Sequence, residues 1–285
     1  MSHMKEKGMK LIFMIAACTS VLAVFLICFF LFANGLPAIG EIGPLKFLFG
    51  KIWRPSNGIY GIFPMIVASI YVTGGAILFG VPIALLTSVF MARYCPKKIY
   101  GPLKSGIELM AGVPSIVYGF FGLILLVPLI REVFGGTGTS MLAASLLLGM
   151  MILPTIIGVT ESAIRSVPES YYEGSLALGA TKERSIFFVI LPAAKSGLLA
   201  GVVLGIGRAI GETMAVIMVA GNQPRMPEGL LKGVRTMTAN IVTEMGYASG
   251  LHRESLIATA VVLFVFILII NLSLSLLNRR AEHAD

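Results

Sequence analysis

Six long runs of apolar residues divide this 285-residue chain, and shorter polar stretches separate them. A helix needs about 20 apolar residues to cross the hydrocarbon core of a bilayer, and each run is about that length or longer. The pattern therefore predicts an all-α integral membrane protein with six transmembrane helices. The predicted spans cover residues 11–33, 62–92, 105–130, 141–159, 196–220 and 255–277.

The longest polar stretch in the middle of the chain covers residues 160–192. Ser166 and Glu169 have the S-x-x-E spacing of a capping box, which predicts a helix start. Gly179 predicts the end of that helix, after about twelve residues. Thr181 is a suitable N-cap for a second helix, which we expect to end at or before Pro192. The stretch thus predicts a folded polar element between two spans.

A pattern inside this stretch resembles the EAA loop of ABC-importer permeases. In that family an acidic residue and two small residues are followed by a glycine and then by a hydrophobic–Leu–Pro end. The resemblance implies the six-helix fold of an ABC type-1 importer permease, with a permease domain over residues 62–280 that is preceded by a tail, anchor helix and external loop over residues 1–61. It also implies a coupling helix, within residues 161–192, that docks on a separate ATPase subunit. The matching residues are Glu173, Gly174, Ser175, Gly179, Leu191 and Pro192. An ordinary loop with a surface helix is the alternative.

Composition agrees with a membrane protein. Only 13% of the residues are charged and 56% are hydrophobic, whereas soluble domains carry about 25% charged residues. The net charge of +8 does not indicate nucleic-acid binding, because the basic residues are scattered over the loops.

The distribution of Lys and Arg predicts the orientation. Thirteen of them lie at the termini and in the loops 93–104 and 161–195, whereas eight lie in the opposite loops. By the positive-inside rule, both termini and the polar stretch are cytoplasmic, in a bacterial or archaeal plasma membrane.

Two charged residues interrupt the fifth predicted span. Arg208 and Glu212 share a stripe of about 80° with Gly201 and Gly205 on a helical wheel. An arginine in mid-membrane costs about 2.5–3.5 kcal/mol on insertion scales, so it needs a cavity or a partner. The arrangement favours a polar path at a subunit interface. One alternative is an internal Arg208–Glu212 ion pair, and another is a glycine seam for helix packing.

Three segments carry a narrower resemblance. GRAIGETMAV, AGVPSIVYG and TESAIRSVPE resemble phosphate-importer permeases, more closely the PstC-type subunit than its PstA-type partner. A guanidinium offers paired donors that match phosphate or carboxylate oxygens. The resemblance implies a PstA-like second permease, two PstB-like ATPase subunits, a PstS-like extracytoplasmic phosphate-binding protein and phosphate as cargo. A PstA-type subunit or a permease for another oxyanion are alternatives.

Other classes lack the residues that they require. The chain has no G-x-x-x-x-G-K-[ST] motif, so ATP must be bound by a partner subunit and no cofactor is expected. Its single Asp is Asp285, and its histidines, His3, His252 and His283, lie outside the predicted spans with no metal-binding spacing, so we expect no catalytic residue and no metal site. A secondary anion transporter or channel remains as a different class.

The polar loop at residues 221–254 allows two interpretations. Its residues Asn222, Arg225, Arg235 and Glu244 either dock the binding protein or belong to a capped external loop.

Overall fold

The computed structural model describes residues 2–282, so Met1, His283 and Asp285 lie outside the described residues. The chain is almost entirely helical. Its α-helices are α1 (Ser2–Ile42), α2 (Pro44–Phe49), α3 (Phe63–Val89), α4 (Lys97–Gly112), α5 (Ser115–Phe121), α6 (Val127–Phe134), α7 (Met141–Ser166), α8 (Glu169–Ala177), α9 (Lys182–Ser185), α10 (Leu191–Ala193), α11 (Lys195–Gly211), α12 (Met214–Val219), α13 (Met237–Glu244) and α14 (Gly250–Glu282). The other elements are the 3-10 turn η1 (Pro55–Asn57), the π-helical segments η2 (Phe90–Tyr94), η3 (Gly122–Leu126) and η4 (Ile186–Ile190), and the strands β1 (Trp53–Arg54) and β2 (Ile59–Tyr60).

The predicted all-α membrane architecture is confirmed. Within the described residues, five helices are long and apolar enough to cross a bilayer, and a bent helix pair provides a sixth. The five are Glu6–Ile42, Phe63–Tyr94, Ser115–Phe134, Met141–Ser166 and Gly250–Ser273. The bent pair joins Lys182–Ala193 to Lys195–Gly211 at an angle of 69°.

Two of the predicted spans are not single helices. The third is broken at Val113 and Pro114, because a proline disfavours helical geometry at the residue before it. The fifth is broken at Glu212 and Thr213, so the predicted continuous helix over residues 196–220 is wrong. The fourth span is longer than predicted and runs to Ser166, so the first residues of the predicted polar loop are helical.

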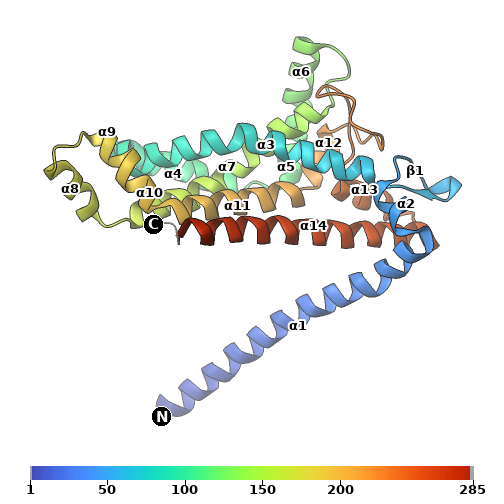
Figure 1. The fold of residues 1–285 in the computed structure, drawn as a ribbon, viewed down its shortest axis with the longest axis horizontal. Helices are drawn as coiled ribbons and strands as arrows, with labels where there is room; N and C mark the ends of the chain where they lie inside the picture. Colours follow the sequence, from blue (N-terminus) through green and yellow to red (C-terminus); the bar gives the residue numbers. More distant parts are fainter. Residues whose placement is uncertain (1, 283–285) are drawn as a thin grey trace.

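The centre of the bundle is formed by α3, α7 and α11, which pack along one another. The backbones of α3 and α7 approach closely where Gly80 faces Gly149, and a Cβ on Gly80 would lie 2.7 Å from the Gly149 carbonyl oxygen. In Figure 1 the N-terminal part of α1 diverges from the bundle, while its other end meets α14. There Phe32 packs edge-on against Phe264 at 6.0 Å.

The two ends of the bundle differ, as Figure 1 shows. At one end, the α8 end, the short helices α8 and α9 project beyond the spans. At the opposite end, the hairpin end, the antiparallel strands β1 and β2 pair Trp53 with Tyr60 beside α2 and α13. The α8 end and the hairpin end therefore lie at opposite ends of the bundle.

Candidate functional site

The first helix predicted in the polar stretch is present as α8, with nine residues. It ends in a Schellman motif: the Ala180 N–H donates to the Ser175 carbonyl at 3.2 Å and the Gly179 N–H to the Leu176 carbonyl at 2.9 Å. Gly179 has φ of 86°, a conformation that strains other residues. The prediction that Gly179 ends this helix is confirmed.

The predicted capping box is wrong. The Ser166 hydroxyl donates to the Ala163 carbonyl at 2.8 Å, so it stays bound to the end of α7. The Glu169 carboxylate accepts a hydrogen bond from Arg93 at 2.8 Å. Both side chains therefore have other partners, and α8 begins after Pro168 with no side-chain cap.

Arg93 attaches α8 to the end of the second span. Only 11% of its side chain is exposed, and its two terminal nitrogens donate to the Glu169 carboxylate and, at 3.3 Å, to the Ile164 carbonyl. The guanidinium also lies over the Tyr172 ring, 5.9 Å from its centroid. Sequence reasoning missed Arg93, because only the fold brings residue 93 next to residue 169. It connects η2, α7 and α8.

A second arginine braces the same end of the bundle. The Arg165 Nε donates to the buried Glu161 carboxylate at 2.6 Å, and its Nη2 donates to the Met91 carbonyl at 2.8 Å. The Tyr100 hydroxyl donates to the same carboxylate at 2.6 Å. A side-chain hydrogen bond with Tyr100 raises the pKa of Lys104. The helix ends of α3, α4 and α7 are thereby tied together where α8 begins.

The outer surface of α8 combines exposed apolar side chains with exposed polar ones. Leu178 follows α8 and is 92% exposed, and Tyr171 is 53% exposed. Gly174 has open space where a Cβ would lie, and Glu173 is exposed. Exposed apolar side chains of this size are typical of a surface that a partner covers. The sequence pattern did not single out Leu178, although it directly precedes the helix-ending glycine.

The predicted second helix begins as expected, because the Thr181 hydroxyl accepts the Arg184 N–H at 3.3 Å. It does not end at or before Pro192. Helical structure continues through η4 and α10 to Ala193, and the 69° bend follows. Leu191 packs against a buried cluster, while Pro192 is exposed. The Ser185 hydroxyl donates to the Ser175 hydroxyl at 2.9 Å and links this second helix to α8.

Arg208 lies near the end of α11 and is half-buried. Its Nη1 donates to the Thr155 hydroxyl of α7 at 3.1 Å. None of the ion pairs between described side chains includes Arg208. Gly201 and Gly205 face α7, where an added Cβ would lie within 2.7 Å of Thr160 and Ile156. The structure therefore places the two glycines in a packing seam and Arg208 at its end.

Glu212 stands at the break in the fifth span. Its Oε1 accepts the N–H groups of Thr213 at 3.0 Å and Ala215 at 3.3 Å, which caps the start of α12. Its backbone carbonyl accepts the Thr238 hydroxyl at 3.1 Å. The carboxylate is thus used at the chain break, and the ion pair with Arg208 that the sequence left open is not formed.

Glu244 is the centre of a buried polar cluster at the hairpin end. Its carboxylate accepts hydrogen bonds from the Arg235 guanidinium, from Trp53 Nε1 at 3.0 Å and from His252 Nε2 at 2.8 Å. The Arg235 Nε also donates to the Asn222 carbonyl at 3.0 Å. His252, predicted to lie outside the spans, belongs to the first turn of α14. These residues face inward and fasten the loop over residues 221–236 to β1, α13 and α14.

Residues 80–283 match the family described as binding-protein-dependent transport system inner membrane component. This chain belongs to that family. It is therefore an integral, multi-pass permease component of an ABC importer, a class that works with separate ATPase and binding-protein partners. The permease itself is the membrane component and not the ATPase.

Curated relatives cover most of the permease. It is 39% identical over 272 residues to the probable ABC transporter permease protein YqgH of Bacillus subtilis. The aligned region covers 90% of this chain and 87% of YqgH. It is 33% identical to the phosphate transport system permease protein PstC of Mesorhizobium japonicum, over 84% of this chain and 80% of the relative. A probable phosphate transport system permease protein PstC of Methanocaldococcus jannaschii is 31% identical, over 91% and 90% of the two chains.

Solved importers share the fold. An inward-facing MetNI methionine ABC transporter superposes with a TM-score of 0.63 at 19% identity, over 81% of this chain and 99% of that chain. A bacterial alginate ABC transporter gives a TM-score of 0.65 at 16% identity, over 94% of both chains. These similarities confirm the predicted permease fold.

Proposed function

We propose that this permease is the PstC-type subunit of an ATP-driven phosphate importer. It pairs with a PstA-like permease, two PstB-like ATPase subunits and a PstS-like phosphate-binding protein. The assignment of phosphate as the substrate rests on the similarity to proteins named as phosphate transport permeases. The similarity covers 84% of this chain in one case and 91% in another. The permease domain begins at residue 62, because α3 is the first helix of the central bundle.

Arg208 supports an anionic cargo. It lies in a span, where an uncompensated charge is costly, and its one side-chain partner among the described residues is the neutral Thr155 hydroxyl. A guanidinium in this position offers its remaining N–H donors to an oxyanion or to the second permease. Arg208 thus contacts phosphate in the translocation path, with Glu212 tuning the local field and the Gly201–Gly205 seam supporting the helix.

The α8 end supports coupling to the ATPase. Glu173, Gly174 and Ser175 lie on α8, and the helix is held by Arg93 at its start and by Ser185 in its second half. Because the helix is attached at two points, a push on its exposed side moves η2 and α9 with it. Leu191 and Pro192 lie at the far end of this element, just before the 69° bend.

The proposed function is tested by ATP hydrolysis in the reconstituted importer. Phosphate-loaded binding protein should stimulate ATPase activity in vesicles that contain both permeases and the ATPase. The same binding protein loaded with sulfate or left empty should not stimulate it. Stimulation by another oxyanion in place of phosphate would contradict the substrate assignment.

The orientation gives a topological prediction. With Cys18 and Cys28 replaced by Ser, the remaining Cys95 should be labelled by an impermeant maleimide only from the cytoplasmic side. In a variant with Cys95 also replaced by Ser, Glu228→Cys should be labelled only from outside. Glu228 is suitable because it is exposed in the loop between α12 and α13. The reverse labelling pattern would place α8 on the outer side of the membrane, where a cytoplasmic ATPase could not bind it.

The contact between Arg93 and Glu169 gives a coupling prediction. A hydrogen bond to a charged group contributes about 1.5–3 kcal/mol, so we expect Arg93→Gln to reduce stimulated ATPase activity and uptake roughly tenfold. Basal ATPase activity and membrane insertion should remain. The exchange Arg93→Glu with Glu169→Arg should restore part of the activity.

Lys98→Gln is the matched control, because Lys98 is an exposed cation in the first turn of α4. Normal coupling in Arg93→Gln would show that α8 does not act through Arg93. An equal loss in Lys98→Gln would point to a general effect of charge near the membrane.

A further inference from the structure

In one cleft at the hairpin end, every charged side chain of the lining is positive. Its volume is about 320 Å3, and its lining residues are Lys51, Ile52, Trp53, Arg54, Gln223, Pro224 and Arg225. We call this the basic cleft. The Arg225 guanidinium donates through Nε and Nη2 to the neutral Gln223 Oε1 at 3.0 and 2.6 Å. Among the side chains that the structure describes, no carboxylate forms an ion pair with Lys51, Arg54 or Arg225.

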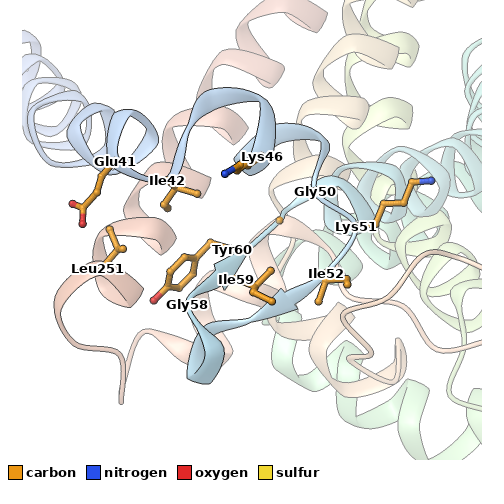
Figure 2. Close-up of a pocket in the computed structure, with 11 residues that line it drawn as sticks. Glu41, Ile42, Lys46, Gly50, Lys51, Ile52, Gly58, Ile59, Tyr60 and Leu251 are labelled. Atoms are coloured by element: carbon orange, nitrogen blue, oxygen red, sulfur yellow. The ribbon is translucent and has the colours of Figure 1, made fainter.

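The neighbouring cavity has a different character. It has a volume of about 620 Å3, and its lining includes the Glu41 carboxylate together with Lys46 and Tyr60. Figure 2 shows that the Lys51 side chain points away from Glu41 and Tyr60, although its backbone borders this cavity. Because one cavity carries both signs of charge and the other carries cations only, the basic cleft is the one that selects an acidic partner.

The basic cleft has one wall from the β1–β2 hairpin and one from the loop over residues 221–236, and the buried Glu244 links the two walls. Trp53 on the hairpin side and Arg235 on the loop side both donate to the buried Glu244 carboxylate. The loop wall is further held where Arg235 Nε donates to the Asn222 carbonyl at 3.0 Å. The cleft is therefore preorganised, which lowers the entropy lost when a partner binds.

The loop wall is also connected to the break in the fifth span. The Val234 N–H donates to the Ala220 carbonyl at 2.8 Å, directly after α12. At the other end of α12, the Thr238 hydroxyl donates to the Glu212 carbonyl at 3.1 Å. A partner held in the basic cleft thus presses on a loop that contacts one end of α12 directly and leads into α13, which contacts the other end.

We propose that the basic cleft docks an acidic surface patch of the extracytoplasmic binding protein. This inference rests on the orientation in the proposed function, which places the hairpin end outside. Exposed cations steer an acidic partner and set its association rate. Lys51, Arg54 and Arg225 are all exposed, so the cleft lacks the buried charged donors of a site built for a free anion. Arg235 and Glu244, which the sequence offered for docking, are turned inward and hold the cleft in shape.

The test is a binding measurement on the complete importer in nanodiscs of phosphatidylcholine, a lipid with no net charge. The variant replaces Lys51, Arg54 and Arg225 by Gln. The Kd for the cognate binding protein should rise roughly tenfold, since each exposed ion pair adds a modest amount. The dependence of Kd on salt should become weaker, while basal ATPase activity stays unchanged. A control variant replaces Arg131, Lys232 and Arg253, three exposed cations outside the cleft, by Gln.

Several outcomes would overturn the docking surface. An unchanged Kd, or an equal rise in the control variant, would show that the cleft does not select the binding protein. A defect that appears only in nanodiscs with anionic lipid would assign the cations to lipid headgroups. If the Kd were unchanged but the variant needed more phosphate for ATPase stimulation at saturating binding protein, the cleft would be assigned to the free anion. Normal docking without phosphate stimulation in the wild type would instead contradict the proposed substrate, so the two failures are distinguishable.

Discussion

Phosphate uptake should be lost when Arg208 is replaced by Gln, while assembly with the ATPase and basal ATPase activity remain. Each hydrogen bond between a charged group and the anion contributes about 1.5–3 kcal/mol, so losing the paired donors of the guanidinium corresponds to a loss in uptake of roughly a hundredfold or more. Gln keeps a polar side chain that can still hydrogen-bond the Thr155 hydroxyl, so the contact between α11 and α7 should survive. Uptake of labelled phosphate in vesicles, with ATPase activity measured on the same preparation, checks this result.

Two further substitutions separate the roles of the charges. Arg208→Lys should retain partial uptake, because a point charge replaces the paired donors of the guanidinium. Glu212→Gln should be mild, because an amide oxygen can still accept the N–H groups of Thr213 and Ala215. Recovery of uptake in the exchange Arg208→Glu with Glu212→Arg would contradict a direct contact between Arg208 and the anion.

Truncation of Leu178 to Ala should weaken the binding of the ATPase subunit roughly ten- to a hundredfold, because burying a leucine side chain contributes about 1.5–3 kcal/mol. Leu178 is 92% exposed in the isolated chain, so the permease itself should keep its thermal stability. The measurement is the Kd between the detergent-solubilised permease pair and the ATPase.

Leu178→Met is the matched control, because it keeps an apolar side chain of similar volume and should bind within about threefold of the wild type. An unchanged Kd in Leu178→Ala would show that the tip of α8 lies outside the ATPase interface. A loss of thermal stability would show that Leu178 packs within the permease pair.

The sequence predicted elements whose signals are local. The apolar runs located the spans, Gly179 ended α8 and Thr181 capped the following helix. In each case the residues that decide the structure lie within a few positions of one another. Hydrophobic periodicity and turn chemistry therefore suffice for these elements.

Features that depend on distant residues were missed. The capping box failed because Arg93, far along the chain, takes the Glu169 carboxylate. The break at Glu212 follows Gly211, but glycine does not distinguish this position because other glycines lie inside α11, and the Thr238 hydroxyl that bonds the Glu212 carbonyl comes from a distant part of the chain. Likewise, no local pattern identifies Thr155 as the hydrogen-bond partner of Arg208.

Because the fifth span is interrupted at Glu212, its two halves belong to different mechanical units. The first half, α11, packs with α7 and α3, whereas α12 packs mainly against α5. The Glu212 carboxylate accepts two N–H groups at the start of α12, and the Glu212 N–H keeps only a long bond of 3.4 Å to the Ala209 carbonyl, so few backbone hydrogen bonds cross this joint. We infer that the two halves of this span can tilt separately, and Arg208 sits one helical turn from the break at Glu212.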